Sequence, residues 1–209
     1  MNPALALLEF ESVAAGVLAV DAMLKRSPVA LLRCGSVNPG RYLALVGGSV
    51  ASTEEAHAAG TEVGCEQKAL IDEVLLPDPN LLLTAAVMGE RMVPQGEALG
   101  VCEVSTSPGL LRVVDEVLKS MPIGLVEIRL ADDLGGRALV IFDGALPDVQ
   151  EAIELVSIRL AAQATPALLH STLLPRIEET LREILTEGTR FAGCANWTPA
   201  GAEILKTEG

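Results

Sequence analysis

The sequence predicts an α/β protein of the α+β type, made of two tandem copies of one split-βαβ domain with helices on one side of each sheet. The first observation is size: the chain has 209 residues, 50% of them apolar, which suits one large domain or two smaller ones. The second is that a segment near the start recurs 94 residues later. The third is that each copy alternates short apolar runs with stretches of helical periodicity.

The repeat is visible as residue identities between the two halves. Residues 4–32 align with residues 98–126, and their identities include Ala4/Ala98, Leu5/Leu99, Glu9/Glu103, Asp21/Asp115, Leu24/Leu118, Lys25/Lys119, Pro28/Pro122 and Leu31/Leu125. The shift becomes 96 where Gly40-Arg41 aligns with Gly136-Arg137, and 98 where ALIDEVLLP aligns with ALLHSTLLP. The order is the same in both halves, so the repeat is not permuted.

Each copy has the element order β-α-β-β-α-β-α. In the first copy we expect strands at 5–10, 29–34, 42–46 and 70–76, and a second helix at 52–64. The first helix begins near Ser12 and ends before Pro28, because the residue before a proline is pushed out of the helical conformation. A further helical segment follows the last strand.

The second copy repeats this pattern. We expect its strands at 99–104, 123–128, 138–142 and 168–174, and its helices at 107–121 and 147–162. The domains are therefore assigned to residues 3–90 and 97–186, joined by a surface linker containing Pro94. Residues 187–209 are interpreted as a C-terminal tail, in which Trp197 is a possible docking residue.

Composition excludes several classes of function. Fifteen Lys and Arg against 28 Asp and Glu give a net charge of −13, which opposes nucleic-acid binding because that binding depends on cations. No segment is apolar enough to span a membrane, and residues 1–10 lack the basic start of a signal peptide. We therefore expect a cytoplasmic protein without a membrane partner.

The four cysteines do not form a metal-binding pattern. Cys34, Cys65, Cys102 and Cys194 are widely spaced, with no CxxC pair. We expect reduced, mostly buried thiols.

The order of motifs resembles the bacterial microcompartment shell domain. The resemblance is carried by DAMLK followed by SPV, a glycine-containing hairpin loop, GGSV or DGAL, and a strand ending in LLPR. Two unpermuted copies over residues 4–185 resemble the tandem-domain trimeric shell proteins, most closely the propanediol-utilisation type. The resemblance implies four-stranded antiparallel sheets, a flat pseudohexameric homotrimer, and facets tiled edge to edge with other shell proteins. Such a ring closes because nearly the same interface is used repeatedly.

The resemblance also places the two hairpin loops at a central pore for small metabolites. The expected pore-lining residues are Ser36, Val37, Asn38, Pro39, Gly40, Asp132, Asp133, Leu134 and Gly135. On a threefold axis the paired aspartates would bring six carboxylates together within a Debye length of about 8 Å, which favours cations. Arg41 and Arg137 follow the loops and are expected to offset part of that charge. The alternative for the aspartates is an ordinary solvated turn.

In cluster-bearing relatives, a cysteine before the Pro-Gly of the first loop supplies a thiolate for an iron–sulfur cluster. Here that position is Asn38, and a carboxamide is a poor iron ligand. We therefore expect no metal and no cofactor, and keep a cluster-bearing electron-transfer component as the alternative function. Cys34 would reach the axis only in a different register.

The resemblance assigns Lys25, Lys119 and Arg176 to the edge of the tile, where arginine can donate to a partner's carbonyl groups. The plainer explanation of the lysines is that they stabilise helix C-termini. The first copy has Asp78 in place of the edge arginine, so the two edges are expected to differ.

An enzyme is not expected. The only histidines, His57 on the second helix and His170 on the fourth strand of the second copy, have no nucleophile or metal partner in their sequence context. We expect a surface His57 and a packed or strand-facing His170. The predicted function is a structural shell protein with a pore; a stand-alone two-domain regulator that binds a small ligand is a third possibility.

Overall fold

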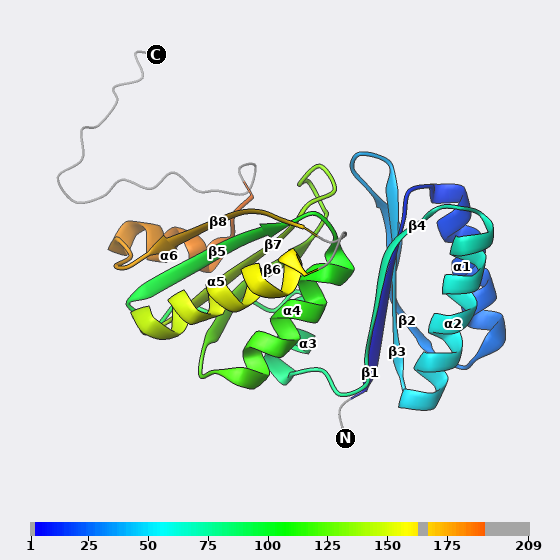
Figure 1. Cartoon of the computed structure of the whole chain (residues 1–209), viewed down its shortest axis with the longest axis horizontal. Helices are drawn as coiled ribbons and strands as arrows, with labels where there is room; N and C mark the ends of the chain where they lie inside the picture. Colours follow the sequence, from blue (N-terminus) through cyan, green and yellow to red (C-terminus); the bar gives the residue numbers. More distant parts are fainter. Residues whose placement is uncertain (1–2, 163–166, 191–209) are drawn as a thin grey trace, which may run out of the picture.

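The computed structural model describes residues 3–162 and 167–190, and each repeat forms one four-stranded antiparallel sheet (Figure 1). The first half contains β1 (Ala4–Phe10), α1 (Val13–Arg26), β2 (Ala30–Val37), β3 (Arg41–Gly48), α2 (Val50–Glu66), β4 (Leu70–Leu76) and α3 (Leu81–Val87). The second contains β5 (Ala98–Val104), α4 (Ser107–Ser120), β6 (Gly124–Leu130), β7 (Ala138–Gly144), α5 (Leu146–Ala161), β8 (Leu168–Leu174) and α6 (Glu179–Glu187). The expected element order is confirmed in both halves.

The strand register reproduces the sequence repeat. The sheets have the orders β2-β3-β1-β4 and β6-β7-β5-β8. Ala4 lies opposite Gly48 as Ala98 lies opposite Gly144, which corresponds to shifts of 94 and 96. Leu76 and Leu174, at a shift of 98, both pair with the leucine at the second position of the central strand. The two halves therefore fold in one register.

Local sequence explains the ends of the equivalent helices α1 and α4. The hydroxyl groups of Ser12 and Thr106 accept hydrogen bonds from the backbone N–H groups of Ala15 and Gly109, which satisfies donors that the first helical turn leaves free. Both helices end two residues before a proline. The residue between, Ser27 in α1 and Met121 in α4, has an extended backbone, as expected before a proline.

Both faces of the first sheet are covered. Leu8, Phe10 and neighbouring side chains pack against α1 and α2. On the opposite face, Leu7 and Leu45 belong to a core that includes α3 and, from the second half, α4. Figure 1 shows α3 and α4 between the two sheets, with α1 and α2 on the outer side. The second half of the chain therefore completes the first domain.

The second sheet corrects the expectation of helices on one side only. Helix α5 covers one face, and α6 covers the other, where Ile177 and Leu185 pack on Leu99, Val126 and Ile141. The physical reason is that the central strands are apolar at successive positions, so both faces require burial.

The linker between the halves is held in place. The carboxylate of Asp143 accepts hydrogen bonds from the N–H groups of Gln95 (2.7 Å) and Gly96 (2.8 Å). Met92 donates its N–H to the carbonyl of Val126.

Among the described helices, none is long and apolar enough to cross a membrane. Trp197 and Cys194 lie outside the described residues.

Candidate functional site

The first expected pore loop is a tight turn at the end of a long hairpin. Strand β2 continues to Val37, so Ser36 and Val37 pair with β3 as strand residues, unlike the expected loop of seven residues. The turn itself is Asn38, Pro39 and Gly40, all exposed. Gly40 has a φ of 116°, a conformation that favours glycine.

The second expected pore loop is longer and carries a series of left-handed residues. Ala131, Asp133, Gly135 and Gly136 all have positive φ between β6 and β7. Asp132 and Asp133 are exposed, whereas Leu134 is half-buried. The rise of the repeat shift from 94 to 96 before Gly136 already places two extra residues in this loop.

The partner of the two aspartates is Arg190. Its guanidinium lies 2.5 Å from a carboxylate oxygen of Asp132 and 3.0 Å from one of Asp133. The ion pair with Asp132 raises the pKa of Arg190. Arg41 and Arg137, which follow the loops, form ion pairs with Glu9 and Glu103 instead of with the loop aspartates. The spacing along the chain gave no signal for Arg190, 57 residues away.

Arg41 instead joins the two loops. Its Nη1 lies 2.6 Å from Oε1 of Glu9, and it donates to the carbonyls of Gly136 (3.0 Å) and Ser105 (3.2 Å). The other oxygen of Glu9 accepts the N–H of Ser107, at the start of α4, at 2.8 Å. Glu9 and Arg41 both belong to the first half, and their hydrogen bonds to Ser105, Ser107 and Gly136 connect them to the second half. The same bonds hold the carbonyl of Gly136 in the second loop in place.

Glu9 is fully buried, which is unusual for a carboxylate. Burial raises its pKa, while the hydrogen bond from Ser107 and the ion pair with Arg41 lower it. The equivalent pair in the second half, Arg137 with Glu103 at 3.1 Å, is exposed at 59% and 36% of the two side chains. The same motif is thus buried between the halves in one case and open in the other.

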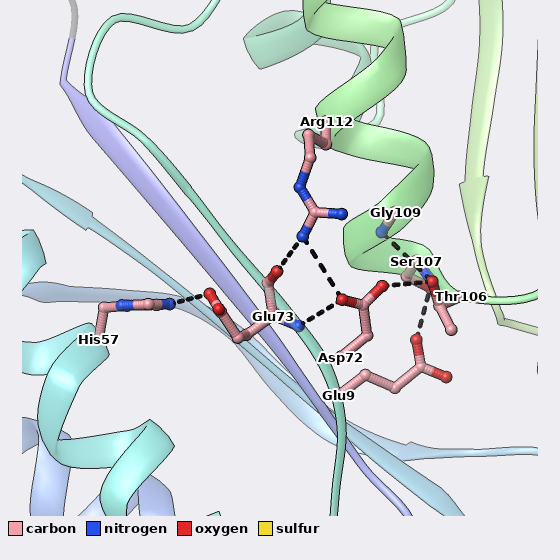
Figure 2. Close-up of polar contacts among 8 residues, drawn as sticks. All are labelled: Glu9, His57, Asp72, Glu73, Thr106, Ser107, Gly109 and Arg112. Atoms are coloured by element: carbon pink, nitrogen blue, oxygen red, sulfur yellow. Dashed lines mark hydrogen bonds and ion pairs between the residues drawn. The ribbon is translucent and has the colours of Figure 1, made fainter. Parts of the chain in front are cut away.

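A polar cluster borders this contact (Figure 2). The hydroxyl of Thr106 donates to Asp72 at 2.5 Å, and Arg112 lies 3.4 Å from the same carboxylate. Arg112 also donates to the backbone carbonyl of Glu73, whose side chain contacts His57. The His57 hydrogen bond lowers the pKa of Glu73. His57 is therefore partly buried and paired, in contrast to the expected surface position, whereas His170 is exposed on β8.

Helices α1 and α4 occupy equivalent positions but differ in burial. Val17 is 53% exposed, whereas its counterpart Leu111 is 1% exposed. Leu24 is 43% exposed, and its counterpart Leu118 is 8% exposed. On α4 these residues belong to the core against the first half. The α1 face is therefore apolar, and in the described part of the chain nothing covers it to the same extent.

The expected edge residues lie at two separate places. Lys119 donates to the carbonyl of Asp78, just after β4, and pairs with Asp115, both at 2.6 Å. Lys25 pairs with Asp21 at 2.6 Å and is largely exposed. Arg176 is exposed after β8, at the position that Asp78 occupies in the first half. Lys119 thus contacts Asp78, the counterpart of Arg176 in the first half. Lys25, on α1 of the first half, pairs instead with Asp21 of its own helix.

Metal binding gains no support within one chain. Among the described residues, no group of three His, Cys, Asp or Glu side chains is arranged to hold a metal ion. Cys34 lies on β2, four residues before the turn, and its hydrogen bond with Tyr42 raises the pKa of Tyr42 to about 12.

Comparison with known proteins gives consistent matches. The model of the BMC domain matches residues 4–79 and 98–177. The bacterial microcompartment shell protein PduT of Citrobacter freundii is 29% identical over 188 residues, covering 90% of this chain and all of the relative. The carboxysome assembly protein CcmO of Synechocystis is 27% identical, covering 90% of this chain and 66% of the relative.

Solved structures share the fold. A microcompartment protein from Desulfitobacterium hafniense is 26% identical with a TM-score of 0.75, covering 88% of this chain and 99% of the other. A fused, permuted hexameric shell protein from the RMM microcompartment has a TM-score of 0.53 at 21% identity, covering 77% and 82% of the two chains.

Proposed function

The chain belongs to the BMC domain family, and on that premise we propose that it is a structural shell protein of a bacterial microcompartment, located in the shell. Three chains supply six domains, which close a flat ring around a central pore. The ring meets other shell proteins edge to edge. The named relatives are shell and assembly proteins, and we propose a non-catalytic role for this chain as well.

The observation that carries this proposal is the difference between α1 and α4. Helix α4 buries Leu111 and Leu118 against the first sheet of the same chain. Helix α1 leaves the equivalent apolar positions exposed. A second copy supplies the missing surface if the contact between the halves is repeated from chain to chain. A repeated heterologous contact closes into a ring when its rotation returns to the first copy, and we propose that this one does so after six domains.

The repeat suggests which contacts cross the chain boundary in this proposal. The open Glu103–Arg137 pair is the counterpart of Glu9–Arg41. In the ring, Glu103 accepts the N–H of Val13 from the next chain, as Glu9 accepts that of Ser107. Arg137 donates to the carbonyl of Gly40 of the next chain, as Arg41 donates to that of Gly136. All six hairpin loops are then tied around one axis.

The two kinds of ring contact are not identical. Arg112 and Asp72, which interact between the halves, have Leu18 and His170 as counterparts. The contact between chains is therefore more apolar at this point. Such a contact would cover the apolar α1 face, which a single chain leaves exposed.

The oligomer of freshly purified protein tests the proposal. We expect light scattering to give about three times the chain mass of 21.8 kDa, with no visible absorption band. A monomer or dimer would contradict the ring and favour the two-domain regulator. A trimer with stoichiometric iron and a brown colour would favour the electron-transfer alternative, in which each chain contributes a ligand at the axis.

The pore loops set the charge of the opening in this proposal. Ser36, Val37, Asn38, Pro39 and Gly40 line it from one domain, and Asp132, Asp133, Leu134 and Gly135 from the other. Arg190 neutralises part of the aspartate charge but brings only one cation to two carboxylates. The ring of six carboxylates and three guanidinium groups retains a negative excess, which favours cations.

Replacing the loop aspartates should change the preference of the pore for charge. In shells assembled with the Asp132→Asn, Asp133→Asn variant, we expect anion entry to rise several-fold relative to cation entry, because three arginines then dominate the opening. The rates are measured with small charged dyes. The matched control is Glu54→Gln, Glu55→Gln, an adjacent carboxylate pair on α2. Equal entry rates in wild type and the aspartate variant would remove the basis of this assignment.

The tile edge contains Lys25, Lys119 and Arg176 in this proposal. Reversing the charge of both lysines (Lys25→Asp, Lys119→Asp) should abolish extended sheets seen by electron microscopy, while light scattering still gives a trimer. Lys68→Asp is the control for a lysine charge reversal outside the edge, since Lys68 lies in the turn between α2 and β4. Sheets that form normally from the double variant would contradict the edge assignment.

A further inference from the structure

A cavity of about 410 Å³ lies between the two halves of the chain, on the side of the hairpin loops. Its walls are β2 and β3 of the first half, β6 of the second, and the segment after α3. Ser36 and Val37 line it next to one loop, and Asp132 lines it next to the other. Its volume is in the range of small-molecule sites.

The cavity concentrates positive charge in a chain with a net charge of −13. Arg33, Arg91, Arg129 and Arg190 line it, together with three carboxylates, Glu90, Glu127 and Asp132. Two of the arginines are neutralised locally. Arg91 forms an ion pair with the buried Glu127, and Arg190 pairs with the loop aspartates.

The other two arginines interact with neutral groups. Arg33 donates to the carbonyl of Met88 at 2.8 Å. Arg129 donates to the hydroxyl of Thr189 at 3.2 Å and to the carbonyl of Asp132 at 2.9 Å. In the described part of the chain, neither guanidinium forms an ion pair with a carboxylate.

Arg129 also retains an unused donor. Its Nε is buried and, among the described residues, has no hydrogen-bond partner. Buried donors are nearly always paired in folded proteins, so an unpaired one indicates a missing partner. A guanidinium presents its N–H groups as a fork that matches the oxygens of a carboxylate or phosphate.

We propose that this cavity binds a small molecule through an oxyanion group, a carboxylate or a phosphate, held by Arg33 and Arg129. The bound oxyanion replaces the carboxylate that these two arginines lack. Because Arg129 also holds the carbonyl of Asp132, the ligand contacts a side chain that positions the second loop. A metabolite at this site is therefore coupled to the loop that we place at the pore.

Calorimetric titration of the full chain tests the site, with inorganic phosphate and succinate as separate probes. We expect at least one to bind with a dissociation constant on the order of 1 mM, and the stronger probe distinguishes the phosphate from the carboxylate chemistry. Arg33→Gln should weaken that binding about tenfold or more, because a charged hydrogen-bond partner is lost. Arg129→Lys should weaken it as well, since lysine keeps the charge but loses the fork.

Arg26→Gln on α1 is the matched control and should leave the dissociation constant unchanged. Light scattering of the same samples shows whether the variants keep the oligomer of the wild type. Absence of saturable binding by both probes would overturn the proposal, and so would an equal effect of Arg33→Gln and Arg26→Gln. A trimer that binds neither probe refutes only the anion site, whereas a monomer that binds phosphate refutes only the ring.

Discussion

Val17→Glu should convert the protein from a trimer to a monomer. Val17 lies at the centre of the exposed α1 face, and its counterpart Leu111 is buried in the equivalent contact between the halves. A glutamate there would be desolvated in the ring without a cation to pair with, at a cost of several kcal/mol per contact. Glutamate is also a good helix former, so α1 itself is expected to remain folded.

Light scattering measures this change directly, with far-ultraviolet circular dichroism as the test of folding. The expected mass falls from about three times 21.8 kDa to 21.8 kDa, while the helical signal is retained. Ile158→Glu is the matched control, since Ile158 is 63% exposed on α5, away from the contact. That variant should stay trimeric. A Val17→Glu variant of unchanged mass would show that α1 does not form the ring contact.

Arg41→Met should destabilise the folded chain by about 3 kcal/mol or more, because it leaves the charge of Glu9 buried without its partner. Arg41 is only 28% exposed and Glu9 is not exposed at all, so solvent screens this pair weakly. The expected result is a lower denaturant midpoint at a fixed protein concentration. The carbonyl of Gly136 loses its donor at the same time, which loosens the second loop.

The double variant Glu9→Gln, Arg41→Met separates the buried charge from the lost contacts. Glutamine still accepts the N–H of Ser107 but carries no charge, so the double variant should be more stable than Arg41→Met alone. Equal instability of the two variants would mean that the charge of Glu9 is not the cause.

The pH dependence gives an independent signature of the same pair. Burial raises the pKa of Glu9 above its usual 4.5, and Arg41 counteracts that rise. Without Arg41 the folded-state pKa is higher still, and a carboxyl group with a raised pKa stabilises the fold at low pH and loses this contribution as the pH rises. The deficit of Arg41→Met should therefore be large at neutral pH and shrink as the pH falls toward 4.5.

The sequence was sufficient for the architecture because the information was local or repeated. Alternating apolar runs, hydroxyl caps such as Ser12, and prolines after the helices determine the elements. The repeat then fixed the register, since the shifts of 94, 96 and 98 recur as strand pairings. The motifs pointed to the same family that the comparisons identify.

The pairing of charges and the covering of faces depended on the tertiary structure. Arg190 reaches Asp132 across 58 residues, and Glu9 reaches Ser107 across 98, and no spacing rule connects such positions. Likewise, α1 and α4 both carry apolar positions, so the pattern alone cannot tell a buried face from an open one. Only the packing of α4 on the first sheet shows which copy of the repeat is satisfied within the chain and which is left for a neighbour.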